Sequence, residues 1–167
     1  MSAFTWNARP EPVSVDLKKS AVVVVDMQNA FASKQGMLDL AGVDISGAPR
    51  VVESIRSILD EARPAGNPVA YLQMGYQPDL SDSGGPSAPN WQFFTGIATN
   101  VCAESTLRDA FFLDYWPLLI TDATMAAGQP ALHDATVENV ENFFGWTLLK
   151  AEFIERVRLG RGIAAAT

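Results

Sequence analysis

The chain has 167 residues, of which 48% are hydrophobic and 19% are charged, so it is long enough for one domain with a sizeable core. Its formal net charge of -7 argues against nucleic acid or an anionic membrane as a partner. The single cysteine excludes an internal disulfide, and the single histidine excludes a multi-histidine zinc site. We therefore expect a cytoplasmic enzyme or binding domain with no signal peptide, membrane span, metal or cofactor.

The first half of the chain predicts a strand, a helix and a second strand. Residues 1–19 form a poorly patterned arm. Residues 21–25 are an uninterrupted apolar run, which suits a parallel strand covered by helices on both faces. After a loop over 32–46, the apolar residues of 48–62 recur at helical spacing, and 68–74 form the second strand. This order predicts a β-α-β unit.

Asp26 ends the first apolar run. Ligands in open α/β sheets bind just beyond the carboxyl ends of strands, so Asp26 lies at the expected edge of a site. A surface aspartate that begins a turn would give the same pattern. Gln28 and Asn29 follow directly and bring two side-chain amides to the same edge.

The segment from residue 75 to residue 91 does not fit this pattern. It contains three prolines, three glycines and three serines, without helical spacing. A parallel sheet needs a crossover of about a dozen residues or more, usually helical, before its next strand. Structureless loops of this length are uncommon in compact domains, so we expect that an element is missing here.

Cys102, the only cysteine, lies where an apolar strand ending at residues 93–94 gives way to a helix that Thr99 or Asn100 caps. The first helical turn favours a thiolate, because unpaired N–H groups and the helix dipole stabilise negative charge, and the thiolate is the reactive nucleophile. The same N–H groups could hold the oxyanion of a tetrahedral intermediate. A lone cysteine packed as a small hydrophobe is the competing interpretation.

The rest of the chain continues the alternation of strands and helices. The predicted elements are a strand over 117–121, a helix over 131–144, a short last strand over 145–149 and a final helix over 151–157. Such alternation implies one α/β domain over residues 1–167, with a doubly wound, mainly parallel sheet flanked by helices. His133 is expected to be a surface residue of its helix, without a role.

Two segments closely resemble the isochorismatase-like cysteine hydrolases, and within them the ureidoacrylate amidohydrolases of the Rut pyrimidine-degradation pathway. They are VVVVDMQNAF (residues 22–31) and GIATNVCAESTLRDAFFLDY (residues 96–115). The segments MLDLAGVDIS, GGPSAPNW, TDAT and ENFFGW extend the match over nearly the whole chain. The resemblance implies a Rossmann-like three-layer fold with a parallel sheet between helices.

The resemblance also implies an Asp–Lys–Cys triad, in which Asp26 matches the aspartate and Cys102 the nucleophile. It further implies a cis peptide between Ile97 and Ala98, which would aim the N–H groups of Ala98 and Cys102 into an oxyanion hole. The implied reaction is hydrolysis of a C–N bond in a small ureido or amide substrate. Ureidoacrylate would give aminoacrylate and carbamate, and carbamate decays to ammonia and carbon dioxide.

The lysine of the triad has no counterpart in this sequence. In the family it lies on a strand between the second strand and the cysteine strand, and that strand with its flanking helices is absent here, between Trp91 and Gln92. The composition of residues 75–91 points to the same place. Of the four lysines, only Lys34 could approach the site. Either a segment of the polypeptide is missing from this sequence, or a true deletion leaves the triad incomplete.

The substrate contacts are less well defined. Gln28, Asn29, Gln73 and Tyr76 are candidates for polar contacts, although each could instead make only local hydrogen bonds. The ureidoacrylate enzymes typically have an Asn and a Trp where this chain has Met74 and Tyr76. A thioether cannot replace the donors and the acceptor of an amide, so the substrate assignment is weaker than the reaction class.

Two other functions remain open. One is a different isochorismatase-like amidohydrolase, such as a nicotinamidase; those that bind metal carry an Asp and histidines after the second strand, and residues 74–79 contain no histidine. The other is a catalytically silent subunit that serves in assembly or binding. We expect a homo-oligomer, because the apolar run 110–116 is long enough for a subunit contact, and Trp116 and Trp146 are expected to be core or subunit-contact aromatics.

Overall fold

A computed structural model describes residues 4–75 and 98–165 of the chain. The helices and strands are β1 (Phe4–Trp6), β2 (Val13–Val15), β3 (Val22–Val25), α1 (Asn29–Ala32), α2 (Met37–Leu40), α3 (Ala48–Ala62), β4 (Val69–Leu72), α5 (Glu104–Phe112), β5 (Leu118–Ile120), α6 (Pro130–Asn139), β6 (Trp146–Leu148) and α7 (Lys150–Ala165). Short helical turns are also present at Leu17–Lys19, Thr99–Ala103, Thr121–Ala123 and Val140–Phe144.

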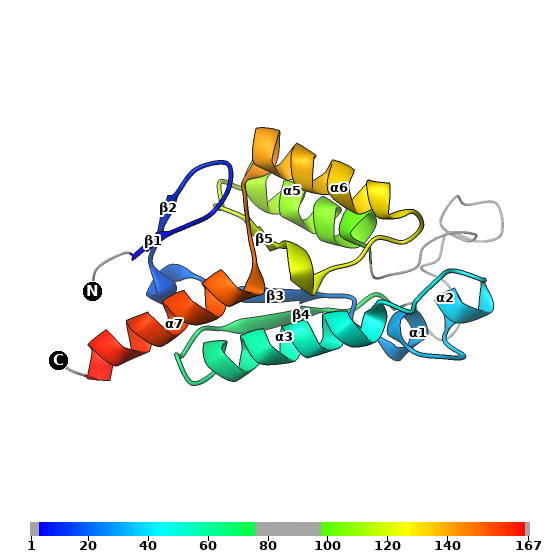
Figure 1. The fold of residues 1–167 in the computed structure, drawn as a ribbon, viewed down its shortest axis with the longest axis horizontal. Coiled ribbons are helices and arrows are strands. Elements are labelled where there is room, and N and C mark those ends of the chain that lie inside the picture. Colours follow the sequence, from blue (N-terminus) through cyan, green and yellow to red (C-terminus); the bar gives the residue numbers. More distant parts are fainter. Residues whose placement is uncertain (1–3, 76–97, 166–167) are drawn as a thin grey trace.

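Two parallel strand pairs form the middle layer of the molecule. β3 pairs with β4 in a register that runs from Val22 opposite Val69 to Val25 opposite Leu72, and α3 connects the two strands. β5 pairs with β6 in the same parallel manner, with α6 between them in the chain. Figure 1 shows α5 and α6 on one side of these strands and α3 on the other. The predicted α/β architecture, with parallel strands between helices, is confirmed.

The N-terminal arm has more structure than its sequence pattern predicts. β1 and β2 pair antiparallel, and Arg9 and Thr147 exchange both of their backbone hydrogen bonds, at 2.9 and 3.0 Å, which joins the hairpin to β6. Trp6 is only 2% exposed and its ring meets that of Phe153 edge-on, with centroids 5.7 Å apart. Burying one large aromatic side chain stabilises this hairpin by about 2–3 kcal/mol. The arm is therefore part of the domain.

The segment after β3 is also more regular than the predicted loop. α1 and α2 are single helical turns that pack Phe31 and Leu38 against Ile45 and Ala48. Neither turn shows enough of a repeat for a helical period to be read from the sequence, and their stability comes from this small apolar cluster rather than from helix propensity.

The main core lies between the hairpin, α3 and α7. α3 has the predicted bounds, and most of the apolar residues at helical spacing are buried, but Val52 is 41% exposed. α7 begins at Lys150, one residue before the predicted start, and continues to Ala165. Buried side chains of this core include Trp6, Val13, Ile58, Ala62, Leu148, Phe153 and Val157.

The strand predicted to end at residues 93–94 lies outside the described residues, as does all but the first residue of the loop 75–91. Within 4–75 and 98–165, none of the helices combines the length and apolar character that crossing a membrane requires. The same residues offer no group of three or more His, Cys, Asp or Glu side chains that could hold a metal ion.

Candidate active site

Asp26 lies at the carboxyl end of β3, as predicted. Its backbone N–H donates to the carbonyl of Leu72 at 2.9 Å, so the ladder between β3 and β4 continues one residue beyond Val25. The residue then leaves the extended conformation with a φ of 50°, in the left-handed region that costs most residues about 1 kcal/mol. Asp26 is only 6% exposed, so its carboxylate is buried. The turn thus fixes an acidic group just beyond the strand.

The buried carboxylate of Asp26 is held by the backbone that follows β4. The N–H of Met74 lies 2.9 Å from both Asp26 Oδ1 and Gln28 Oε1, and it donates to both oxygens. Gln28 Nε2 in turn donates to the carbonyl of Met74 at 2.9 Å. This arrangement satisfies one oxygen of Asp26 and both polar atoms of the Gln28 side chain.

Cys102 lies in the first turn of the helix that leads into α5, but that turn begins differently from the prediction. Ala98 is the cap, one residue before Thr99 and two before Asn100, and no side chain caps the turn. The carbonyl of Ala98 accepts from the N–H groups of Val101 and Ala103 at 3.1 and 3.2 Å. The turn is therefore wider than an α-helical one, a geometry that often marks functional sites.

The structure brings the thiol of Cys102 to the carboxylate of Asp26. Burial of the half-buried thiol, followed by its hydrogen bond to Asp26 and the negative charge of that group, raises the pKa of Cys102 to about 12. Its own backbone N–H lowers the pKa, but by less. The predicted thiolate is therefore wrong for the protein without a ligand. At such a pKa the thiol is protonated near neutral pH.

The turn that carries Cys102 is tied to the loop before α6. The N–H of Thr99 donates to the carbonyl of Met125 at 2.9 Å, and the N–H of Ala127 donates to Asn100 Oδ1 at 3.1 Å. These contacts hold the turn against the loop before α6. They could not be read from the sequence, because the loop shows no pattern that connects it to the cysteine.

His133 is less exposed than the predicted surface position. It is half-buried, and its Nδ1 lies 2.9 Å from the hydroxyl oxygen of Thr99, which is completely buried. The contact joins α6 to the turn that carries Cys102. Sequence reasoning missed it because a lone histidine on a helix gives no indication of its partner.

The four lysines lie away from the pair formed by Asp26 and Cys102. Lys34, the one candidate from the sequence, is exposed and its Nζ lies 3.1 Å from Asp39 Oδ1. Lys150 donates from Nζ to Ser54 Oγ at 3.1 Å. Lys18 and Lys19 belong to the short turn before β3. Within the described parts of the chain, no lysine is hydrogen-bonded or paired with Asp26 or Cys102.

The candidates for substrate contacts fall into different settings. Each polar atom of the Gln28 amide makes one hydrogen bond with the Met74 backbone, so this side chain is held in place beside the site, and its substrate contact stays a prediction. Gln73 is exposed, Asn29 is exposed at the start of α1, and Tyr76 lies outside the described residues. The Ile97–Ala98 peptide lies partly outside them, so the oxyanion hole at Ala98 and Cys102 stays a prediction.

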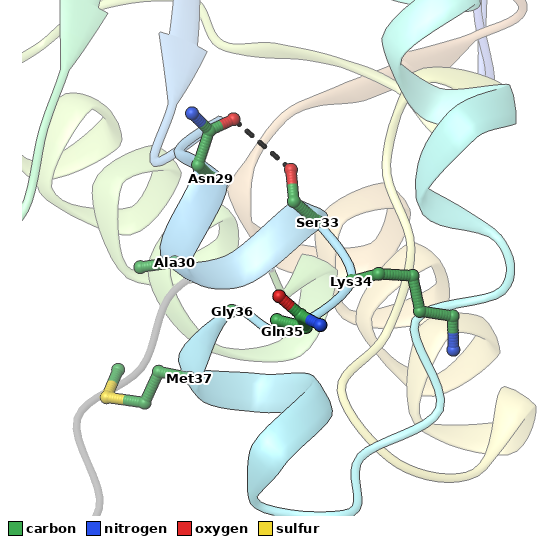
Figure 2. Close-up of a pocket in the computed structure, with 7 residues that line it drawn as sticks. All are labelled: Asn29, Ala30, Ser33, Lys34, Gln35, Gly36 and Met37. Carbon is green, nitrogen blue, oxygen red and sulfur yellow. Dashed lines mark hydrogen bonds between the residues drawn. The ribbon is translucent and has the colours of Figure 1, made fainter.

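An open hollow of about 570 Å³ lies next to this site along the chain, between α1 and α2 (Figure 2). Asn29 lines it and accepts a hydrogen bond from Ser33 Oγ at 3.2 Å. The hollow contains neither Asp26 nor Cys102, and an acyl-transfer site needs a nucleophile and a base. We therefore place the candidate active site at Asp26 and Cys102.

Comparison with known proteins identifies the family. The Isochorismatase domain matches residues 87–152, which include Cys102. Ureidoacrylate amidohydrolase RutB from Caulobacter segnis is 37% identical over 212 residues, covering 87% of this chain and 89% of the relative. The chain belongs to the isochorismatase family. The protein of the same name from Azorhizobium caulinodans is 38% identical over 212 residues, covering 87% of this chain and 93% of its own.

Two solved structures of hydrolases share the fold. A cysteine hydrolase from Pseudomonas syringae superimposes with a TM-score of 0.73 at 22% identity, covering 87% of this chain and 95% of its own. An isochorismatase-like hydrolase from Alkaliphilus metalliredigens does so with a TM-score of 0.60 at 16% identity, covering 81% and 97%. At these identities the agreement concerns the fold alone.

The alignments with the two amidohydrolases contain positions that have no counterpart in this chain. They extend over 212 residues, whereas 87% of 167 residues is about 145, so about 67 aligned positions have no counterpart here. A strand with flanking helices has about this size. The absence predicted from the sequence lies between Trp91 and Gln92.

Proposed function

We propose that this isochorismatase-family hydrolase is a cysteine amidohydrolase that cleaves the C–N bond of ureidoacrylate. The observation that carries the proposal is the buried Asp26 carboxylate beyond the end of β3, which lies close enough to the Cys102 thiol to raise its pKa. A nucleophile in contact with a fixed base is the arrangement that acyl transfer requires. The relatives named ureidoacrylate amidohydrolase support the choice of substrate.

In the first step Asp26 takes the thiol proton while the Cys102 sulfur attacks the ureido carbonyl carbon. The high pKa of the thiol means that the proton leaves during the attack rather than before it. The carbonyl oxygen becomes an oxyanion, and the N–H groups of Ala98 and Cys102 are the proposed donors to it. Asp26 is now a neutral acid.

The intermediate then collapses. The C–N bond to the acrylate portion breaks, Asp26 returns its proton to the leaving nitrogen, and aminoacrylate departs from a carbamoyl thioester on Cys102. Water, deprotonated by Asp26, attacks the thioester carbon and releases carbamate while the thiol regains its proton. Over the cycle one water is consumed, and carbamate decays to ammonia and carbon dioxide.

Ammonia release from ureidoacrylate tests this proposal, with nicotinamide as the competing substrate. We expect turnover of ureidoacrylate to exceed that of nicotinamide, and none with the Cys102→Ala variant. Turnover of nicotinamide alone would replace the substrate assignment but keep the reaction class. Turnover that survives in the variant would remove Cys102 from the mechanism.

A second candidate, a catalytically silent subunit, is favoured by two observations. No lysine pairs with Asp26 or Cys102 in the described parts of the chain, and the pKa of the thiol is raised to about 12. In the same parts β4 pairs only with β3, and its Tyr71 and Leu72 are 57% and 40% exposed. A deletion beside β4 would leave an edge of this kind.

Two measurements separate these candidates. An intact mass of 18.0 kDa for the denatured polypeptide would establish the deletion, whereas a mass several kilodaltons higher would reveal a further segment able to supply the lysine. Iodoacetamide labelling that is slow near neutral pH in both the presence and the absence of substrate, together with no ammonia release, would establish the silent subunit.

We also propose that the protein is a homo-oligomer that associates through an aromatic patch at the end of α5. Five large side chains of this patch are 66% to 72% exposed, and Trp116 stacks on Trp146 with ring centroids 5.3 Å apart. Exposed apolar surface of this kind is typical of subunit contacts. A single monomeric species in sedimentation velocity would overturn the proposal. The patch consists of Phe112, Leu113, Tyr115, Trp116 and Phe143.

A further inference from the structure

Thr99 is a buried polar residue in the turn that carries the nucleophile. It is 0% exposed and stands three residues before Cys102. A buried hydroxyl needs a hydrogen-bond partner, because an unpaired one costs about 1–3 kcal/mol. The position of this partner therefore constrains the position of the turn that carries Cys102.

The partner of the Thr99 hydroxyl is His133 on α6. Its Nδ1 lies 2.9 Å from Thr99 Oγ1, and either the hydroxyl donates to an unprotonated Nδ1 or a protonated Nδ1 donates to the hydroxyl. The hydrogen bond between the imidazole and the hydroxyl can form in either case. The contact is therefore a fixed link between the helix and the turn.

The helix that carries His133, α6, is itself held against α5 by a side-chain contact. It runs alongside α5 in Figure 1, and Thr136, one helical turn after His133, donates its hydroxyl hydrogen bond to Glu104 Oε2. Glu104 also accepts from Arg108. His133 of α6 therefore contacts the turn that carries Cys102, whereas Thr136 contacts α5, so the two contacts can be removed separately.

We propose that His133 is a positioning residue that acts through Thr99 to hold Cys102 against Asp26. The inference rests on the proposed hydrolase function for its kinetic consequence, but its structural consequence concerns the thiol alone. Catalytic groups must be held within a fraction of an ångström of the productive geometry, and a displacement of about 1 Å can lower a rate about 10²-fold. The hydrogen bond of His133 is to Thr99, and its effect on Cys102 is therefore indirect.

Kinetics of four single variants, and of the double variant with both His133→Leu and Thr99→Val, give the first test. His133→Leu and Thr99→Val both remove the link, whereas Thr99→Ser and His133→Asn keep a hydrogen-bonding group near the same position. We expect the first two to lower kcat for ureidoacrylate about tenfold, with KM changed less than about threefold. We expect Thr99→Ser to stay within about twofold of the unaltered protein, and the double variant to fall no further than the worse single one.

Alkylation of Cys102 gives a second test that requires no substrate. If the turn shifts, the thiol loses the burial and the carboxylate neighbour that keep it protonated, so iodoacetamide labelling at pH 8 should rise about tenfold while kcat falls. Opposite changes in reactivity and turnover are the expected signature. If the unaltered protein fails to hydrolyse ureidoacrylate, the proposed function fails, and the labelling rates still decide the role of His133.

Thr136→Val is the matched control, because it removes a buried threonine hydrogen bond from the same helix without touching Thr99. We expect a lower Tm with an unchanged labelling rate. Equal labelling in Thr136→Val, His133→Leu and Thr99→Val would reduce His133 to a general structural role and overturn the proposal. If His133→Leu does not fold, the pair Thr99→Val and Thr99→Ser decides alone, and equal labelling in that pair overturns it.

Discussion

The two halves of the candidate site are held in different ways. Asp26 is fixed by main chain: its N–H continues the ladder to Leu72, and its carboxylate accepts from the N–H of Met74. The turn with Cys102 is fixed in large part by side chains, namely the hydroxyl of Thr99 and the amide of Asn100. The base is thus built into the sheet, whereas the nucleophile depends on partners from a later helix and loop.

This difference has a consequence for the tolerance of the site to change. Many sequences can form a parallel ladder between apolar strands, so the position of the carboxylate survives most substitutions around it. The position of the sulfur depends on a few specific hydrogen bonds, and a single substitution can remove one of them. Substitutions around Asp26 and substitutions around Cys102 should therefore differ both in the property that they change and in the size of the effect.

Replacement of the nucleophile is the largest expected effect. Cys102→Ala should lower ureidoacrylate turnover by at least about 10⁴-fold, because the carbamoyl thioester can no longer form. Ammonia release under saturating substrate measures this change, and an unchanged Tm shows that the fold is intact. Turnover above this limit would mean that Asp26 alone activates water.

Replacement of the base should have a smaller kinetic effect and an opposite effect on the thiol. Asp26→Asn keeps an oxygen for the Met74 N–H but cannot take a proton, so kcat should fall by about 10²–10⁴-fold. Loss of the negative charge should lower the pKa of Cys102 from about 12 toward its ordinary range.

Iodoacetamide labelling of the Asp26→Asn variant checks that sign. A lower pKa means more thiolate at a given pH, so labelling at pH 8 should be at least about tenfold faster than in the unaltered protein. In the unaltered protein the rate should keep rising through pH 10 without a plateau. Equal labelling of both proteins would mean that Asp26 does not raise the pKa of Cys102, and the two residues would not form one site.

A stability effect is expected where α6 supports α5. Burial raises the pKa of Glu104, but hydrogen bonds from Thr136 and Arg108 lower it more, so the net pKa is below its usual value. A carboxyl with a depressed folded-state pKa stabilises the fold above its unfolded pKa, and this stabilisation is lost as the pH falls through the folded value. Thr136→Val should cost about 1–2 kcal/mol at pH 7.

Thermal unfolding of the Thr136→Val variant between pH 7 and pH 3 measures this contribution. The difference in Tm from the unaltered protein should be largest near neutral pH and should shrink as Glu104 becomes protonated. A difference that does not depend on pH would mean that Thr136 stabilises the helix by packing, without its hydrogen bond to the carboxylate.

How well the sequence predicts each part follows from the range of the contacts involved. α3 and the parallel β3–β4 pair were predicted because apolar spacing and apolar runs are local properties, and Asp26 followed because it ends one of those runs. The hairpin of residues 4–15 was not predicted, because each of its strands has only three residues and the hairpin is stabilised by burial of Trp6 in the core.

The errors at the nucleophile have a different origin. The expected thiolate came from the helix start alone, whereas burial and the charge of Asp26, a residue distant in sequence, dominate the pKa of Cys102. The partner of Thr99 is distant in the same sense, since His133 lies on a separate helix. Periodicity describes which face of a helix is buried, but not which polar side chains meet across two elements.

The smallest effect is expected from Lys34, the lysine that follows Asp26 most closely in the sequence. Its Nζ lies 3.1 Å from Asp39 Oδ1, and the side chain is 84% exposed, so it neither touches the carboxylate of the site nor stabilises a thiolate. Lys34→Ala should leave kcat and the labelling rate of Cys102 within about twofold, because an exposed ion pair contributes little. Lys34→Arg serves as the control that keeps the charge. A loss of turnover in Lys34→Ala that Lys34→Arg restores would mean that this ammonium moves to Asp26 when substrate binds, and the nucleophile would then depend on a third, mobile group.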